Sequence, residues 1–319
     1  MLTILPLNSG KNNKEKFLSI TFVAHDRQKI MKVSGFSFIR NAIKFDYPVK
    51  EAIQSVLPLC DDFYMAVGKS EDNTLALIQT IDPKIRIIES VWDDSLNKGG
   101  EVLARETDKA FQAIPVESDW CVYIQADEVI HEEYLEPIGE SMIKWKDNPE
   151  VEGLLFNYLH FFGSYDYIAT APNWYRKEIR IIKNNKSIYS YRDAQGFRKG
   201  KNKKLNVKPV DAIIYHYGWV KHPEIQMRKH QAFHKLYHQD ESLHKNLYMA
   251  NEFDYSSIDV LKKFHGTHPS VMRSRVKSQN WKFDHDLSYN KMSFKNRLKS
   301  LCEKYLGIIP GEYRNYRIV

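Results

Sequence analysis

The segment most suited to chemistry is an apolar run that ends abruptly in acidic residues. Residues 120–128 read WCVYIQADE, and the apolar part has the length and composition of a buried strand. Ligands of open α/β sheets bind at the carboxyl ends of strands, so Asp127 and Glu128 are expected beside a crevice. Carboxylate oxygens suit Mg²⁺ or Mn²⁺ bound to phosphates. The alternative is a solvated turn in which Asp127 caps a helix, and this segment alone favours neither interpretation.

A histidine also lies at the end of an apolar run. Residues 212–219 read AIIYHYGW, which predicts a buried strand ending in His216 beside a glycine. Histidine is a frequent metal ligand, although a single histidine in such a run is more often a core residue. His222, in the segment KHP, is the alternative ligand.

Two further segments carry residues suited to a nucleotide. Gly100 follows another glycine and begins a predicted helix, whose free N–H groups suit a phosphate. Arg105 in that helix can meet a diphosphate, or it forms an exposed ion pair with Glu101. Asp72 can accept hydrogen bonds from a base or ribose, but its segment, SEDN, is equally a turn without a ligand.

The hydrophobic pattern predicts the elements that position these residues. After Met31, short β-rich runs alternate with helical patterns, as in a layered α/β sheet. The expected strands of the first half are residues 33–39, 63–67, 84–88 and 120–124, with helices near 48–56 and 100–113. Apolar runs at 153–162, 178–182 and 212–215 predict a mixed extension of the sheet. Helical patterns return at 225–237 and 293–306, the latter capped by Ser293 and ended by Gly307.

Composition limits the class of protein. The chain has 319 residues, 43% hydrophobic and 27% charged, which excludes a disordered, fibrous or small disulfide-stapled protein. The net charge of +7 and the 13% aromatic content suit an anionic or ring-shaped partner. The three cysteines are far apart and outside any C-x-x-C pair, which indicates a reducing compartment. No apolar run approaches the ~18–20 residues that cross a bilayer.

We expect three parts along the chain. Residues 1–30 are interpreted as a poorly ordered N-terminal extension, and Met31, just before a strong strand pattern, as the biological start of translation. The first seven residues lack the length and the basic segment of an export signal, which favours a cytoplasmic location. Residues 31–220 form the main domain, and residues 221–319 a mostly helical C-terminal extension.

The order of four segments resembles a known family. FIRN at 38–41, VGKSEDNT at 67–74, GGEVLARET at 99–107 and QADE at 125–128 follow one another as in the family 2 glycosyltransferases of the GT-A fold, particularly bacterial enzymes that build surface polysaccharides or lipid-linked glycans. The resemblance covers residues 31–219 and implies a Rossmann-like mixed sheet flanked by helices. It also implies transfer of a sugar from a nucleotide-sugar donor.

The resemblance assigns roles to individual residues. The metal, Mn²⁺ or Mg²⁺, is expected on Asp127 and His216, with Glu128 as a helper. Gln125 departs from the family pattern because it replaces the first acid of D-x-D and brings no negative charge to a cation. It is still expected to bind the donor, because an amide can bond a ribose hydroxyl. The remaining donor-binding residues are expected to be Arg40, Asn41, Asp72, Gly100 and Arg105.

An inverting transfer also needs a general base and an acceptor cleft. Asp193 is the expected base, with Glu178 and Asp166 as alternatives; a salt bridge to Arg192 or Arg198 is the structural interpretation of Asp193. Sugar rings lie well on aromatic faces. Tyr165, Tyr167 and Trp174 are the expected acceptor-binding residues, whereas Phe161 and Phe162 are assigned to the core.

Three functions remain open from the sequence. The first is an inverting, metal-assisted hexosyltransferase-like enzyme that uses a UDP- or GDP-linked donor and a glycan or lipid-linked acceptor. The second is a nucleic-acid-binding protein, suggested by the basic segment at 199–204, although no specific nucleic-acid motif is present. The third is a glycosyltransferase-like binding protein without turnover. The amphipathic helix at 293–306 is interpreted as packed on its own domain, with peripheral contact at the inner membrane as the alternative.

Overall fold

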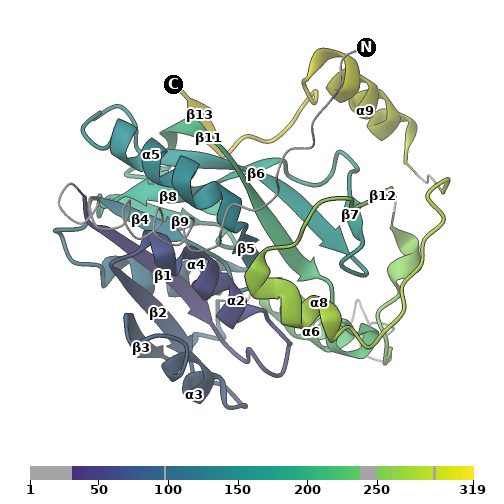
Figure 1. The fold of residues 1–319 in the computed structure, drawn as a ribbon, viewed down its shortest axis with the longest axis horizontal. Helices are drawn as coiled ribbons and strands as arrows, with labels where there is room; N and C mark the ends of the chain where they lie inside the picture. Colours follow the sequence, from purple (N-terminus) through teal and green to yellow (C-terminus); the bar gives the residue numbers. More distant parts are fainter. Residues whose placement is uncertain (1–30, 97, 238–249, 259, 290–291) are drawn as a thin grey trace, which may run out of the picture.

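The computed structural model describes residues 31–96, 98–237, 250–258, 260–289 and 292–319. Its centre is a mixed sheet whose main path has the strand order β3-β2-β1-β4-β8-β6-β11-β10-β9 (Figure 1). The prediction of a Rossmann-like mixed sheet flanked by helices is confirmed by this arrangement. The N-terminal extension predicted for residues 1–30 lies outside the described residues.

The first half of the sheet is parallel. β1 pairs in parallel with β2 and with β4, and β2 pairs in parallel with β3. Four strands and three connecting helices make up this half: β1 (Val33–Ile39), α2 (Val49–Val56), β2 (Asp62–Gly68), α3 (Thr74–Gln79), β3 (Ile85–Ser90), α4 (Glu101–Gln112) and β4 (Trp120–Tyr123). Parallel strands present their carboxyl ends at one edge, so the residues after β1 and β4 are brought together there.

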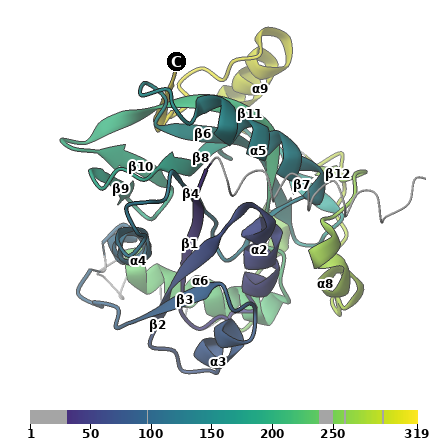
Figure 2. The same cartoon turned by 60° about the vertical axis from the view of Figure 1, so that its left-hand side comes forward.

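Helices cover both faces of this half, so that its central strands, β1 and β4, are buried on both sides. On one face, Phe36 of β1 packs against Phe111 of α4, with ring centroids 5.3 Å apart. On the other face, Ile53 of α2 joins a cluster that includes Val33 and Ile130. Figure 2 shows α4 and α2 on opposite sides of β1.

The second half mixes strand directions. β8 (Lys177–Lys183) runs antiparallel to β4 and to β6 (Gly153–Phe162), whereas the long β11 (Lys203–Trp219) runs parallel to β6. Short β5 (Glu128–Ile130) pairs antiparallel with β11, placing Glu128 opposite His216. The other elements of this half are α5 (Leu135–Trp145), β7 (Tyr167–Ala169), β9 (Ile188–Tyr191) and β10 (Gly196–Lys199).

The C-terminal part is attached to the sheet by strands and helices. β12 (Leu261–Lys263) pairs with β7, and β13 (Tyr316–Ile318) pairs with β11. Its helices are α6 (Pro223–Tyr237), α8 (Arg273–Lys277) and α9 (Phe294–Leu306). The helices predicted at 225–237 and 293–306 are thereby confirmed, and long stretches between them are irregular.

Helix α9 begins and ends as its sequence predicts. The Ser293 side chain accepts a hydrogen bond from the Asn296 N–H, and Gly307 adopts a left-handed φ of 67°. No residue of α9 is fully buried, but Glu303 accepts two hydrogen bonds from Arg176, at 2.7 and 3.0 Å, which hold the helix to the main domain. The interpretation of this helix as packed on its own domain stays a prediction. Within the described part of the chain, no helix is long and apolar enough to span a bilayer.

Candidate functional site

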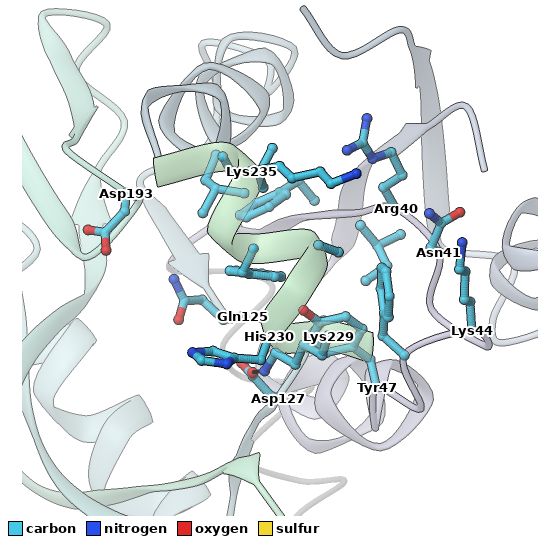
Figure 3. A pocket seen from close by; sticks show the side chains of 18 of the residues that line it. Arg40, Asn41, Lys44, Tyr47, Gln125, Asp127, Asp193, Lys229, His230 and Lys235 are labelled. Atoms are coloured by element: carbon cyan, nitrogen blue, oxygen red, sulfur yellow. Dashed lines mark hydrogen bonds and ion pairs between the residues drawn. The ribbon is translucent and has the colours of Figure 1, made fainter. Parts of the chain in front are cut away.

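A cavity of about 1170 Å³ lies at the carboxyl ends of β1 and β4. Arg40 and Asn41 reach it directly after β1, and Gln125 and Asp127 shortly after β4. Helix α6 forms one wall, and His216 of β11 lines the floor near Asp127. Figure 3 shows Asp127 and Gln125 on one side of α6, with Arg40, Asn41 and Lys44 on the other.

Asp127 is fixed by the pairing of β5 with β11. The Tyr217 N–H donates to the Asp127 carbonyl oxygen at 2.8 Å, and the register places the next residue, Glu128, opposite His216. One carboxylate oxygen of Asp127 therefore lies 3.9 Å from His216 Nε2. The two residues predicted as metal ligands do meet, whereas His222 lines a different, smaller cavity. Their role as ligands stays a prediction.

Gly218 leaves space between the two predicted ligands. A Cβ atom at this position would lie 2.7 Å from His216 Nε2 and 2.8 Å from Asp127 Oδ2, which is closer than atoms in contact can approach. Only glycine is accommodated there without displacing the carboxylate or the imidazole. Glycine at 218 therefore lets the carboxylate and the imidazole lie close against the backbone.

A lysine that sequence reasoning missed is bonded to the same carboxylate. Lys229 Nζ of α6 donates to Asp127 Oδ2 at 3.0 Å and to the Gly218 carbonyl oxygen at 3.1 Å. Burial alone would raise the pKa of Asp127, but the opposing effects, of which the charge of Lys229 is the largest, outweigh it and hold that pKa well below its usual range. Asp127 is therefore an ionised carboxylate with a cation already in contact.

Positive charge is crowded around this carboxylate. Lys221 is fully buried, and its Nζ donates to the Asp46 carbonyl oxygen at 2.6 Å. Burial, followed by the charge of Lys229, lowers the pKa of Lys221 to about 7. Burial likewise lowers the pKa of His216, which favours its neutral form.

The donor atoms near Asp127 do not match a usual divalent-ion site. Gln125 supplies no charge, and its amide donates to the Ala194 carbonyl oxygen at 3.1 Å. His216 Nδ1 lies 3.1 Å from His160 Nδ1. Within the described ranges, no group of three His, Cys, Asp or Glu residues is placed to hold a metal ion. Two donors remain, and an ammonium group is already bonded to one of them.

Beneath the cavity lies a buried ion pair. Glu128 is completely buried and accepts two hydrogen bonds from Arg180, at 2.8 and 2.7 Å. It also accepts one from the Tyr158 hydroxyl at 2.8 Å and one from the Gln125 N–H at 3.1 Å. Glu128 thus holds the turn that carries Asp127 and does not line the cavity.

Other predicted donor-binding residues divide into two groups. Arg40 and Asn41 line the cavity, where the guanidinium of Arg40 lies 4.1 Å from the ring centroid of Trp92. Asn41 has a left-handed φ of 57° and accepts a hydrogen bond from the Glu71 N–H at 2.8 Å. Asp72 instead accepts hydrogen bonds from the N–H groups of neighbouring turns and lies outside the cavity lining.

Gly100 and Arg105 are also placed away from the main cavity. The Gly100 N–H donates to the Leu236 carbonyl oxygen at 3.0 Å and is therefore not free for a phosphate. Arg105 forms the exposed ion pair with Glu101, at 3.1 Å, that was the alternative from the sequence. Arg105 lines a neighbouring cavity of about 840 Å³, which shares Asp193 with the main one.

Asp193 is the one of the three predicted general bases that lines the main cavity. It lies between Arg192 and Ala194, both with left-handed φ angles, of 57° and 64°. Such backbone conformations are costly for residues other than glycine and cluster at functional positions. The Tyr237 hydroxyl donates to Asp193 at 2.8 Å, whereas Arg198, its suggested salt-bridge partner, donates to the Asn315 carbonyl oxygen instead.

The aromatic residues predicted for the acceptor are not at this cavity. Tyr165 and Tyr167 are buried, 5% and 4% exposed, and the Tyr167 hydroxyl donates to Asp284 at 2.8 Å. Trp174 packs against His160, with ring centroids 4.9 Å apart. Aromatic side chains that do line the cavity are those of Phe38, Phe45, Tyr47, Trp92, Tyr175, Trp219, Phe233 and Tyr237.

The charge lining the cavity favours an anionic ligand. Its basic residues are Arg40, Lys44, Lys69, Arg180, Arg228, Lys229 and Lys235. Its acidic residues are Glu71, Asp94, Asp127 and Asp193. Excess positive charge in a low-dielectric hollow attracts anions and stabilises phosphate groups.

Comparison with known proteins was made at three levels. No protein-family model matches the sequence, and no curated protein matches it. Among solved structures, Staphylococcus aureus TarS matches with 12% identity and a TM-score of 0.35, over 64% of this chain and 39% of that chain. TarS 1–349 in complex with UDP matches with 15% identity and a TM-score of 0.34, over 68% and 69% of the two chains.

A third match is glucosyl-3-phosphoglycerate synthase from Mycobacterium tuberculosis in complex with Mn²⁺ and UDP-glucose. Its identity is 15% and its TM-score 0.29, over 49% of this chain and 50% of that chain. Likenesses of this size carry no argument about activity, so the functional assignment depends on the cavity itself.

The buried pair of Arg180 and Glu128 gives the first testable prediction. Arg180→Met leaves the Glu128 carboxylate buried without a counter-charge, so the free energy of unfolding should fall by about 3–5 kcal/mol. Urea denaturation at neutral pH measures this loss. The double variant Arg180→Met/Glu128→Gln removes both charges and should recover much of it. Wild-type stability in the single variant would contradict the interpretation.

Glu178 gives a prediction for the pH dependence of stability. It is 2% exposed, and burial raises its pKa from 4.5 to about 8. Because the folded state holds this proton and the unfolded state loses it above pH 4.5, stability should fall as the pH rises from 4.5 to about 8. Each unit of pKa shift corresponds to about 1.4 kcal/mol. In Glu178→Gln this component should be absent, which denaturation over the same pH range will show; identical profiles would refute the assignment.

Proposed function

We propose that this protein is a glycosyltransferase of the GT-A type that moves a sugar from a nucleotide-sugar donor to a glycan or lipid-linked acceptor. The observation that carries the proposal is one cavity that combines an ionised, cation-bound Asp127 with a separate carboxylate, Asp193, under a predominantly basic lining. The order of the sequence motifs supports the same class. The donor is a UDP- or GDP-linked hexose.

In an inverting transfer, the carboxylates of Asp193 and Asp127 would have different roles. Asp193 would take the proton from the acceptor hydroxyl as its oxygen attacks the sugar carbon. The departing nucleoside diphosphate gains negative charge and needs positive charge beside it. Because Asp127 is itself negative, a cation must lie between it and the diphosphate. The sequence predicts a divalent ion in this role, whereas the structure offers the ammonium group of Lys229.

The two alternatives, a nucleic-acid-binding protein and a binding protein without turnover, differ from a transferase in what they would bind or release. The basic segment at 199–204 lies in the hairpin between β10 and β11, and its Lys199 forms an ion pair with Glu152, the residue before β6. This supports a solvated connector, with no specific nucleic-acid ligand. A binding protein without turnover would hold the nucleotide sugar but release no nucleotide.

The test is a screen of UDP- and GDP-linked sugars for nucleotide release. We expect release from at least one donor, and a fall of about 10²- to 10⁴-fold in Asp193→Asn, the range that a general base contributes. Donor affinity, measured by calorimetry, should change little in this variant. Asp166→Asn, an exposed carboxylate outside the cavity lining, is the matched control and should retain wild-type release. Donor binding without release would favour the non-catalytic alternative.

We propose further that the protein works at the cytoplasmic face of an anionic membrane, where lipid-linked acceptors lie. Helix α9 supports this location because apolar and basic side chains alternate on an exposed helix. Its large apolar residues are Phe294, Leu298, Leu301, Tyr305 and Leu306, between 51% and 85% exposed. Its basic residues are Lys295, Arg297, Lys299 and Lys304. Such a helix lies in the interface of anionic lipids.

Vesicle sedimentation tests the role of α9. Wild-type protein should bind vesicles that contain phosphatidylglycerol and should be released by salt. Leu298→Ser/Leu301→Ser removes buried apolar area and should abolish this binding without changing the melting temperature, because neither side chain is buried in the fold. Ile143→Ser, at an exposed apolar position on α5, is the control. Equal binding by all three proteins would contradict the proposal.

A further inference from the structure

The cation that contacts Asp127 is a side chain of the protein itself, Lys229. Lys229 extends from α6, and its side chain is only 12% exposed. Its ammonium group lies 4.9 Å from the ring centroid of Tyr47 and 5.5 Å from that of Phe233, so aromatic faces surround it as well as the carboxylate. Figure 3 shows Lys229, Tyr47 and Asp127 gathered beside α6. The position is confined by several elements at once.

The ammonium group retains a donor for a ligand. A lysine carries three N–H donors, and the carboxylate of Asp127 and the carbonyl of Gly218 account for two. Lys229 also lines the main cavity. One N–H donor is therefore left to bind an anion that enters the cavity.

Lys229 and a divalent ion exclude one another at this position. Lys229 already binds Asp127 Oδ2, so an ion held between Asp127 Oδ1 and His216 Nε2, which lie 3.9 Å apart, would stand beside the ammonium group and be repelled by it. A cation there would be left with Asp127 and His216, because Gln125 stands where a second acid is expected. An amide in place of an acid at 125 and an ammonium group at 229 each make the site more positive by one charge, and together they match the two charges of a divalent ion.

We propose that Lys229 takes the place of the divalent ion, so that its ammonium group, held by Asp127, binds the diphosphate of the donor directly. This inference rests on the proposed function. In the transfer, the bond between the sugar carbon and the diphosphate oxygen breaks, the bond to the acceptor oxygen forms, and the acceptor proton goes to Asp193. The electron pair of the broken bond stays on the diphosphate, where Lys229 neutralises it.

Nucleotide affinity without metal is the first measurement. UDP and GDP are titrated calorimetrically, once in EDTA and once with MnCl₂. Wild-type protein should bind one of them equally well in both buffers. Lys229→Met should lose about tenfold or more in EDTA, as expected for a hydrogen bond between charged groups. Lys144→Met removes an equal charge from an exposed site on α5 and should match the wild type. Affinity that requires Mn²⁺ in the wild type, with no loss in Lys229→Met, would overturn the inference.

Binding of Mn²⁺ alone separates this inference from the proposed function. Followed by electron paramagnetic resonance without nucleotide, the wild type should bind no Mn²⁺ at the site, whereas Lys229→Met exposes the Asp127 carboxylate and should bind it. Equal Mn²⁺ binding by both proteins would overturn the inference, even if nucleotide sugars are substrates. Absence of UDP and GDP binding in every buffer would instead reject the proposed function, and the inference with it.

A double variant that lacks both charges controls for misfolding of Lys229→Met. Lys229→Met leaves a buried carboxylate, so Asp127→Asn/Lys229→Met is made in parallel and compared by circular dichroism. This double variant should fold, bind no Mn²⁺ and bind nucleotide as weakly as Lys229→Met. Nucleotide affinity at the wild-type level in the folded double variant would show that Lys229 does not contact the diphosphate.

Discussion

The candidate site depends on one buried ion pair, between Arg180 and Glu128. Both side chains are out of contact with water, so each is tolerated only because the other is present. The pair joins β5 to β8, and through the hydroxyl of Tyr158 it also reaches β6. Because Glu128 accepts the Gln125 N–H as well, it fixes the turn from which Asp127 projects. The position of the Asp127 carboxylate is thus set by a buried ion pair beneath the cavity.

Much of the fold follows from local patterns in the sequence. β1 occupies residues 33–39 as expected, because the small and apolar residues of VSGFSFI suit a central strand that is buried on both faces. The ends of α9 follow from Ser293 and Gly307, whose side-chain chemistry and backbone freedom act locally. Asp127 and His216 were expected at strand ends, and the pairing of β5 with β11 brings them together.

Other parts of the site had no local signal. Lys229 is 102 positions from Asp127 and lies in a segment that reads only as a polar helix. For Asp72 and Arg105, hydrogen bonds and an ion pair with near neighbours replaced the ligand contacts that their types suggested. Tyr165 and Tyr167 have polar sequence neighbours, yet packing against the C-terminal part buries them. In each case the deciding contact is a property of tertiary structure or of a competing local bond.

The carboxyl end of α6 meets the amino end of α4, and this contact limits the positive potential that α4 can offer to an anion. The last carbonyl groups of α6, from Leu236 and Tyr237, accept the N–H groups of Gly100 and Gly99, at the start of α4. The negative end of one macrodipole therefore meets the positive end of the other, and each cancels the field that the other would project into solvent. The amino end of α4 therefore projects little positive potential into the cavity. Attraction of an anion must then come from side chains such as those of Arg40 and Lys229, whose identity mutation can alter without rebuilding the backbone.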